Sequence, residues 1–215
     1  MKNVLLIGLG LFGKTVAEEL YKLGHQVMAV DRDEKCVNDV LDYVTGAQIG
    51  DSTNADFLKG LGIDNYDVCI VTIRKDFQSS LETTALLKDL GAKFVVARAT
   101  SNFHERFLLR NGADKIVFPE KQMAKWTAVR YSADHMLDYF QLDENLSIFE
   151  VDVPEKWVGK TVAEIDVRKK FNINIMGVFA DGKISATIGP DTVFKAEHPI
   201  LVMGNFKDVQ KCFKL

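Results

Sequence analysis

Residues 1–13 read MKNVLLIGLGLFG, and this stretch decides the fold of the chain. The apolar run at 4–7 predicts a short buried strand that leads directly into the pattern Gly8-x-Gly10-x-x-Gly13. In a dinucleotide-binding strand–turn–helix, such glycines allow a tight turn, close approach of a phosphate, and close packing of the helix on the strand. The first N–H groups of that helix attract the phosphate. The stretch therefore predicts a nucleotide-binding loop.

A carboxylate follows the second predicted strand. Residues 14–22 have helical periodicity, and residues 27–30 form a short apolar strand that ends at Asp31. Asp31 lies roughly twenty residues beyond the glycines, where the acid of this motif accepts hydrogen bonds from the ribose hydroxyls. A carboxylate there repels a 2′-phosphate and favours NAD or an adenine nucleotide, although Arg32 blurs the preference. The open alternative is that Asp31 caps the next helix.

Composition narrows the class of protein. The 215 residues allow one large domain or two modest ones. The net charge of −3 gives no basic footprint, so nucleic acid is not expected as a partner. No apolar stretch approaches the roughly 20 residues that span a bilayer, and no signal peptide is expected. The cysteines Cys36, Cys69 and Cys212 are scattered, as expected for free thiols in a cytosolic protein.

Strands and helices alternate through the first half of the chain. Further strands are expected at 47–50, 68–72, 94–98 and 116–118, with helices between them. Six such steps predict a Rossmann-like α/β fold with a doubly wound parallel sheet, whose ligands bind at the carboxyl ends of the strands. The residues that directly follow the predicted strands are Gly8, Asp31, Asp51, Thr72, Ile73, Arg98 and Glu120.

A long crossover helix is expected over 121–140. Its apolar residues cover more than one face, which predicts a second buried surface against another subunit. The open alternative is a helix between two domains of one chain. We expect a domain boundary between 141 and 142, which gives domains of 1–141 and 142–215.

The last part of the chain predicts a small α+β domain. We expect a strand at 146–153, a short helix at 161–170 and a hairpin around Asp181-Gly182. Strands at 192–194 and 199–203 follow, and Asn205 caps a final helix. Such small domains often complete their core by dimerising.

The sequence offers no convincing catalytic group. A Rossmann dehydrogenase needs an acid–base residue beside the nicotinamide. Of the histidines, His25, His135 and His198 lie away from the predicted ligand edge, and His104 alone lies on that side. This favours a sensor over an enzyme. An NAD-dependent oxidoreductase and a nucleotide or redox sensor unrelated to a channel stay open as alternatives.

Four segments together resemble a known family. They are IGLGLFG at 7–13, AVDRDEKCV at 29–37, GADKIVFPEKQMA at 112–124 and GPDTVFKAEHPILVMG at 189–204. With them the whole chain resembles the cytosolic regulatory subunits of Trk/Ktr potassium uptake systems, which contain an RCK N-terminal and an RCK C-terminal domain.

The resemblance implies a gating mechanism. It implies that the chain binds ATP, ADP or NAD(H), pairs through the crossover helix, and forms a dimer and then a tetramer or octamer ring. The ring would dock on the cytoplasmic face of a potassium-translocating membrane subunit. A nucleotide would move the gate through its differential affinity for two ring states.

The resemblance also implies roles for individual residues. Glu120 would help to hold a divalent cation with the phosphates. The implied binding residues are the loop residues Gly8, Gly10, Leu11, Phe12 and Gly13, the ribose acid Asp31 with Arg32, and the cleft residues Asp51, Ser52, Ile73, Arg74, Arg98, Ala99, Thr100, His104 and Glu120.

Two further points follow from the resemblance. Leu11 stands where many ATP-sensing members carry arginine, which removes a phosphate-binding charge. Some relatives bind cyclic di-adenylate in the C-terminal domain, and the segment 167–175, with Arg168, Ile173 and Ile175, would be the corresponding site. The open alternative is an ordinary helix-to-strand turn.

Overall fold

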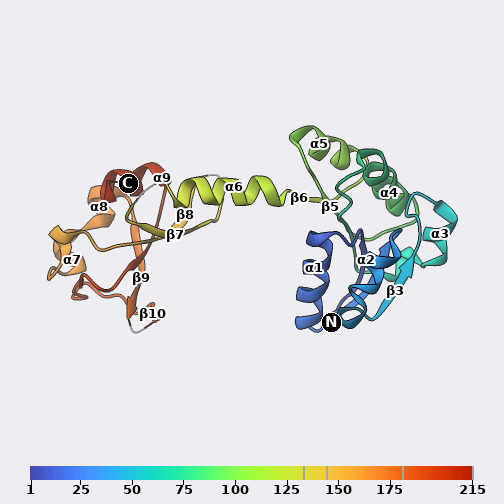
Figure 1. The fold of residues 1–215 in the computed structure, drawn as a ribbon. Helices are drawn as coiled ribbons and strands as arrows, with labels where there is room; N and C mark the ends of the chain where they lie inside the picture. Colours follow the sequence, from blue (N-terminus) through green and yellow to red (C-terminus); the bar gives the residue numbers. More distant parts are fainter. Residues whose placement is uncertain (133, 144, 181, 215) are drawn as a thin grey trace. The chain divides into compact units, whose positions relative to one another are not determined.

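The computed structural model describes residues 1–132, 134–143, 145–180 and 182–214 (Figure 1). Its contacts group into two compact units, Met1–Lys121 and Gln122–Leu215. Among the described residues, no helix is both long enough and apolar enough to cross a lipid bilayer.

The first unit contains a six-stranded parallel sheet in the order β3-β2-β1-β4-β5-β6. The order reverses between β1 and β4, which is where ligands bind in doubly wound sheets. This confirms the predicted fold class. The strands are β1 (Asn3–Ile7), β2 (Gln26–Asp31), β3 (Gly46–Ile49), β4 (Val68–Val71), β5 (Val95–Arg98) and β6 (Lys115–Val117).

Helices cover both faces of this sheet. Successive side chains of a strand point to opposite faces, and in β1 Val4 and Leu6 join one buried cluster while Leu5 and Ile7 join another. The central strand is therefore apolar throughout. The helices are α1 (Leu11–Lys22), α2 (Glu34–Asn38), α3 (Ala55–Gly60), α4 (Phe77–Asp89) and α5 (Asn102–Arg110), with short 3₁₀ turns η1 (Leu41–Tyr43) and η2 (Ile63–Asn65).

The helix starts differ in one respect that matters for the site. Asp33, Asn54, Asp76 and Ser101 accept hydrogen bonds from backbone N–H groups at the starts of α2, α3, α4 and α5. At the start of α1 the N-cap is Gly10, and no side chain caps the helix. The first N–H groups of α1 are therefore not occupied by a side-chain cap.

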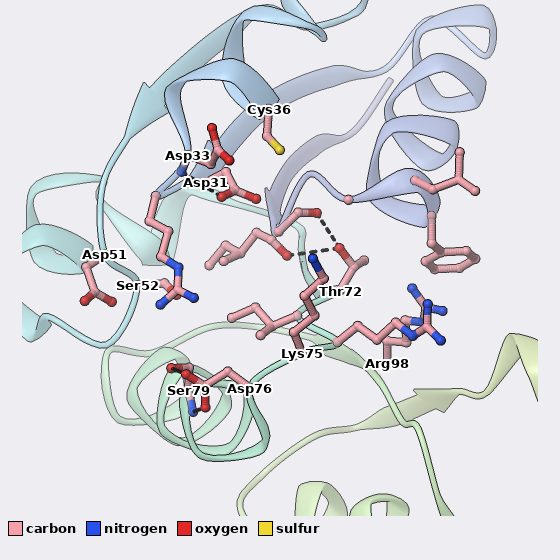
Figure 2. A pocket seen from close by; sticks show the side chains of 18 of the residues that line it. Asp31, Asp33, Cys36, Asp51, Ser52, Thr72, Lys75, Asp76, Ser79 and Arg98 are labelled. Atoms are coloured by element: carbon pink, nitrogen blue, oxygen red, sulfur yellow. Dashed lines mark hydrogen bonds between the residues drawn. The ribbon is translucent and has the colours of Figure 1, made fainter.

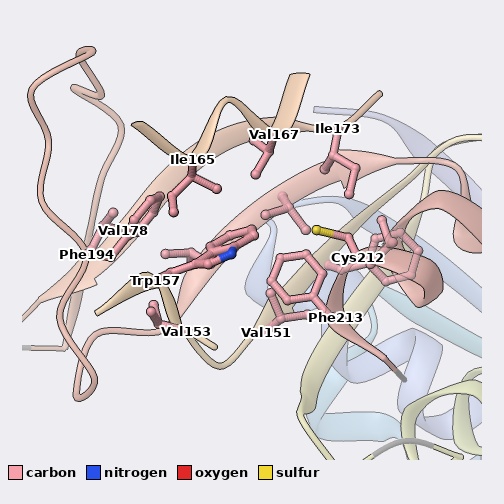
Figure 3. Packing of buried hydrophobic residues seen from close by; sticks show 14 of the residues in the cluster. Val151, Val153, Trp157, Ile165, Val167, Ile173, Val178, Phe194, Cys212 and Phe213 are labelled. Atoms are coloured by element: carbon pink, nitrogen blue, oxygen red, sulfur yellow. The ribbon is translucent and has the colours of Figure 1, made fainter. Parts of the chain in front are cut away.

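The second unit contains an antiparallel sheet in the order β10-β9-β11-β8-β7. Its buried interior is rich in aromatic rings: the Trp157 ring lies 5.4 Å from Phe194 and 5.2 Å from Phe213 (Figure 3). The elements are β7 (Met136–Gln141), β8 (Ser147–Val151), η3 (Glu155–Trp157), α7 (Val162–Ile165), α8 (Val167–Phe171), β9 (Asn174–Ala180), β10 (Lys183–Ser185), β11 (Ile200–Gly204) and α9 (Phe206–Phe213).

The predicted helix over 121–140 was wrong in its second half. Helix α6 spans Pro119–Arg130, and β7 follows. Pairing of β7 with β8 explains the difference, because it buries Met136 and stacks Tyr139 against Phe149 at 6.0 Å. We expected the domain boundary between 141 and 142 on the assumption of a continuous helix, whereas the contacts divide the chain after Lys121.

Smaller differences occur later in the chain. Residues 161–170 form two short helices instead of one, because Asp166 adopts the left-handed conformation between them with φ of 51°. Residues 192–194 form an isolated bridge, Thr161 to Val193, rather than a strand. The predicted hairpin is β9 and β10, although Asp181 of its turn lies outside the described residues. Asn205 caps α9 as predicted.

Candidate functional site

A cavity of about 730 Å³ lies at the carboxyl ends of the parallel strands (Figure 2). Its size is that of a small-molecule or cofactor site. It is lined by the loop after β1, the ends of β2 and β5, the residues that follow β3 and β4, and the start of α6. The lining residues are Ile7, Gly8, Gly10, Leu11, Phe12, Thr15, Asp31, Arg32, Asp33, Cys36, Gly50, Asp51, Ser52, Thr72, Ile73, Arg74, Lys75, Asp76, Ser79, Arg98 and Glu120.

The three glycines of the loop have distinct geometries. Gly8 has φ of +94°, which other residues rarely adopt, and its N–H donates to the Val30 carbonyl at 2.8 Å. A Cβ on Gly13 would lie 2.0 Å from the Gly8 carbonyl oxygen, which itself accepts a hydrogen bond from the Thr72 hydroxyl. A Cβ on Gly10 would meet nothing within 4 Å. The loop is therefore packed tightly behind Gly8 and is open at Gly10.

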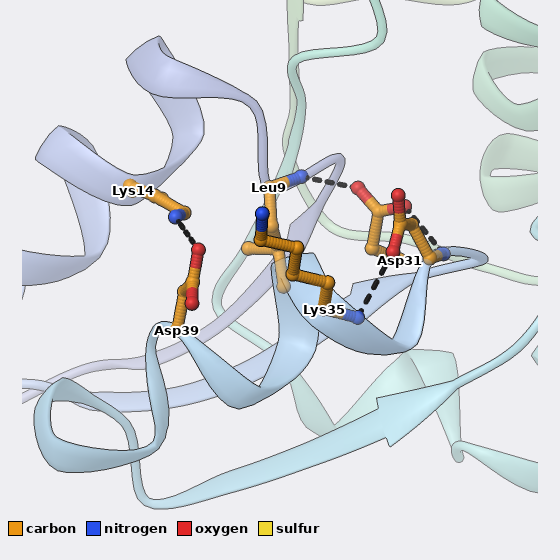
Figure 4. A network of polar contacts seen from close by, with 6 residues as sticks. Leu9, Lys14, Asp31, Lys35 and Asp39 are labelled. Carbon is orange, nitrogen blue, oxygen red and sulfur yellow. Dashed lines mark hydrogen bonds and ion pairs between the residues drawn. The ribbon is translucent and has the colours of Figure 1, made fainter.

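Asp31 connects the end of β2 to the glycine loop. Its carboxylate accepts the Leu9 N–H at 2.6 Å and the Asp33 N–H at 2.9 Å (Figure 4). The alternative that Asp31 caps the next helix is wrong, because the cap of α2 is Asp33, which accepts the Lys35 N–H at 2.9 Å. Two carboxylate oxygens offer about four acceptor positions, so Asp31 has acceptor capacity left for ribose hydroxyls.

A buried arginine lies at the other side of the loop. The Arg98 side chain is 10% exposed, its guanidinium lies 4.9 Å from the centre of the Phe12 ring, and its Nη2 donates to Glu120 Oε1 at 2.5 Å. Arg98 Nε has no hydrogen-bond partner among the described residues. Arg74 Nε lies 3.9 Å from the same Glu120 oxygen. The pKa of Glu120 is lowered by its own backbone N–H and, further, by the Arg98 guanidinium.

The loop after β3 supplies an acid and a hydroxyl. Asp51 is exposed and accepts hydrogen bonds from the N–H and the hydroxyl of Thr53, which lower the pKa of its carboxyl. Ser52 is buried, and its hydroxyl lies 2.7 Å from the Thr83 hydroxyl of α4. Asp51 is therefore the exposed acid of this loop that lines the cavity.

Four of the predicted site residues are not among the residues that line the cavity. Gly13 lies behind the glycine loop, and Ala99 is fully buried. Thr100 is exposed, but outside the cavity. The His104 ring lies 4.8 Å from the Phe77 ring, and its Nδ1 lies 3.2 Å from the Thr100 hydroxyl. Burial lowers the pKa of His104, so the ring is neutral at pH 7. The other predicted residues line the cavity.

Sequence reasoning missed several lining residues. Thr72 directly follows β4, and the loop beyond it adds Lys75 and Asp76 where the strand order reverses. Burial and the charge of Asp31 raise the pKa of the Cys36 thiol, which is therefore protonated. The loop after β4 lies where the strand order reverses, and this position is the sequence signal that could have identified its residues. The missed residues are Ile7, Thr15, Asp33, Cys36, Gly50, Thr72, Lys75, Asp76 and Ser79.

The second unit has a cavity of its own, of about 530 Å³. It includes Val167, Arg168, Ile173 and Ile175 of the segment singled out in the sequence. Arg168 Nε donates to the Asn174 side-chain oxygen at 2.7 Å. The segment thus places Arg168, oriented by its hydrogen bond to Asn174, beside apolar side chains that line the same cavity.

Comparison with known proteins gives consistent results. The TrkA-N domain family matches residues 4–119, and the TrkA-C domain family matches residues 146–215. Ktr system potassium uptake protein C of Bacillus subtilis (strain 168) is 36% identical, over 98% of this chain and 95% of that protein. Ktr system potassium uptake protein A of the same organism is 34% identical with the same coverage.

Solved structures agree on the fold. The GsuK channel superposes with a TM-score of 0.69 at 19% identity, over 97% of this chain and 38% of that chain. The chain therefore spans about two fifths of that structure's length. From its TrkA-N and TrkA-C domains and its Ktr relatives, the chain belongs to the Trk/Ktr family of potassium uptake regulatory subunits.

Proposed function

We propose that this chain is a nucleotide-sensing gating subunit of a potassium uptake system, with the cavity of the first unit as its sensor. The observation that carries the proposal is that one cavity contains an open glycine loop, the uncapped start of α1, a buried arginine and Asp31. These groups suit the phosphates and the ribose of ATP, ADP or NAD(H).

The residues present fit such a ligand. At the phosphate end, the open face of Gly10 leaves room for a phosphate. The Nε of Arg98, which has no hydrogen-bond partner within the described part of the chain, offers a donor. At the ribose end, the Asp31 carboxylate is held by two backbone N–H groups and keeps further acceptor positions. Figure 2 shows Asp31, Thr72, Lys75 and Arg98 around the same space.

We propose that the cavity binds its ligand without catalysis. The carboxylates of Asp31, Asp51 and Asp76 accept hydrogen bonds from backbone N–H groups. The N–H and hydroxyl of Thr53 lower the pKa of Asp51, and the hydroxyl and N–H of Ser79 lower the pKa of Asp76. Both carboxylates are thereby kept ionised rather than poised for proton transfer. This suits binding better than the acid–base step of an oxidoreductase.

The relatives' names support a partner in potassium uptake. We infer that the chain associates with a potassium-translocating membrane subunit at the cytoplasmic face of the membrane, as a dimer within a tetrameric or octameric ring. The proposed self-association surface includes α6, where Met123 is 56% exposed. The nucleotide would change the assembly through its different affinity for two conformations.

Glu120 is the proposed ligand for a divalent cation that accompanies the nucleotide. One carboxylate is a weak site on its own, and phosphate oxygens would complete the coordination shell. Glu120 is bonded to Arg98, so cation binding requires that this ion pair open.

The cavity of the second unit is the proposed site of cyclic di-adenylate. Arg168 suits a phosphate, and the neighbouring Ile173 and Ile175 suit the flat face of a base. Both isoleucines line the cavity together with Ile188 and Pro190.

Thermal-shift titration of the full chain tests these proposals. ATP, ADP, NADH and cyclic di-adenylate are titrated separately, with cytidine diphosphate as the control for binding that does not require adenine. We expect a melting temperature that rises with the concentration of at least one adenine nucleotide. No shift with any of them would contradict the sensor function, and steady oxidation of NADH with a substrate would favour the oxidoreductase.

A further inference from the structure

Arg98, the buried arginine of the cavity, already has an anionic partner. The Arg98 side chain is 10% exposed, and a buried charge is costly unless it is paired. Its Nη2 meets this need by donating to Glu120 Oε1 at 2.5 Å. Its Nε has no hydrogen-bond partner among the described residues, so the guanidinium fork is only partly used.

The same guanidinium lies beside the glycine loop. Its central carbon is 4.9 Å from the centre of the Phe12 ring, in the first turn of α1. A phosphate drawn to the uncapped start of α1 would therefore come close to Arg98. Leu11, which is 86% exposed and uncharged, supplies no cation here, and Lys14 of the same turn is paired with Asp39 and does not line the cavity. A guanidinium prefers a bidentate anion such as phosphate.

We propose that Glu120 is an internal competitor of the ligand: it occupies Arg98 in the free protein, and a nucleotide phosphate takes its place. This inference rests on the proposed function. The exchange favours a ligand that carries phosphate over a bare nucleoside. The exchange also explains how the carboxylate of Glu120 becomes available to a divalent cation. A phosphate on Arg98 leaves that carboxylate without its buried partner.

Replacement of Glu120 by a phosphate on Arg98 would loosen the attachment of the first turn of α6. Glu120 is the second residue of this helix, so its bond to Arg98 ties the end of β5 to the first turn of α6. After release, Arg74 at 3.9 Å remains as an exposed and weak partner. Lys121 keeps its hydrogen bond to Asn102 at 2.9 Å, so the first turn retains a second attachment.

Glu120→Gln tests the competition. Calorimetric titration of the full chain with ADP and with adenosine is done in EDTA, so that no divalent cation contributes. We expect Glu120→Gln to bind ADP about three- to tenfold more tightly than the unmodified chain, as for loss of one partly exposed ion pair. Adenosine affinity should not change. Glu105→Gln is the matched control, because Glu105 pairs with Lys121 and does not line the cavity.

Arg98 variants show whether the gain in ADP affinity depends on Arg98. Arg98→Gln should reduce the affinity for ADP toward that for adenosine, and Arg98→Lys, which keeps the charge but loses the fork, should lie between. Adding Glu120→Gln to Arg98→Gln should give no gain. Circular dichroism confirms that each variant is folded, and the lysine variant preserves the test should the glutamine variant unfold.

Three results would overturn the inference. They are weaker or unchanged ADP binding by Glu120→Gln in EDTA, an equal gain in Glu105→Gln, and a gain that persists in the Arg98→Gln background. If the unmodified chain binds neither ADP nor adenosine, the proposed function itself fails and the inference falls with it. Binding of ADP without any gain in Glu120→Gln refutes the competition alone.

Discussion

The two units differ in where they place their polar side chains. In the first, the strands run parallel, so their carboxyl ends share one edge, and the glycine loop, Asp31 and Arg98 meet there. In the second, the strands run antiparallel and their ends alternate between edges. Its interior is instead dominated by the packed rings of Trp157, Phe194 and Phe213. Strand direction thus decides whether the loop residues of a sheet gather into one site.

The largest expected effect tests the contribution of the aromatic core to the stability of the second unit. Phe194 is 1% exposed and packs on Trp157, so Phe194→Ala should lower the free energy of unfolding of the second unit by about 3–5 kcal/mol. The neighbouring Val193→Ala is the control, because Val193 is 46% exposed. Denaturant unfolding followed by circular dichroism measures the change. Loss of ADP binding by the folded variant would show that the two units are not energetically separate.

The second prediction concerns the tight part of the glycine loop. Gly13→Ala places a methyl group 2.0 Å from the Gly8 carbonyl oxygen, so we expect destabilisation of the first unit by about 1–3 kcal/mol and loss of nucleotide binding. Gly10→Ala has open space around its Cβ. It should keep the melting temperature and weaken only ligands with phosphate. Equal melting temperatures for both variants would contradict the loop geometry.

The third prediction isolates the ribose end of the cavity. Asp31→Asn should weaken adenosine binding about tenfold, or roughly 1.4 kcal/mol, because a charged acceptor of hydroxyl hydrogen bonds is lost. The asparagine oxygen can still accept the Leu9 N–H, whereas its NH2 group would face the Asp33 N–H and that hydrogen bond would be lost. Titration with 2′,3′-dideoxyadenosine, which lacks both ribose hydroxyls, is the control. An equal loss with this ligand would mean that Asp31 acts only through the loop.

The smallest predicted effect is a pH response of opposite sign in the two units. Burial tends to raise the pKa of Asp114, but Lys88 and the Val95 N–H outweigh it and lower that pKa overall. The stability that Asp114 contributes is therefore present above the ordinary carboxyl range and is lost as the pH falls. Asp114→Asn should reduce this loss, by less than about 1 kcal/mol for a partly exposed pair.

Glu150 of the second unit should respond in the other direction. Burial, together with the charge of Asp138, raises its pKa. Its contribution then becomes more favourable as the pH falls through that raised pKa, and Glu150→Gln should remove this gain. Hydrogen exchange at pH 4 and 7, resolved by unit, measures both effects. The same sign in both units would contradict the assigned environments.

Much of the first unit could be predicted from sequence. Short apolar runs such as 4–7 and 68–72 must be buried on both faces, and their alternation with helices specifies a parallel sheet. The residues that follow these runs lie at one edge, so twelve of the sixteen predicted site residues line the cavity. His104 does not, because its ring packs against Phe77, and a packing partner on another helix is invisible to a linear pattern.

The sequence by itself determined the glycine loop, because a positive φ at Gly8 and the missing side chain at Gly13 are local requirements of the backbone. Tertiary structure alone decided the end of α6 and the partner of Arg98. Pairing with β8 turned residues 136–141 into a strand, since backbone hydrogen bonds to a distant segment outweigh local helical periodicity. The bond from Arg98 to Glu120 likewise arises only when the fold brings β5 and the start of α6 together.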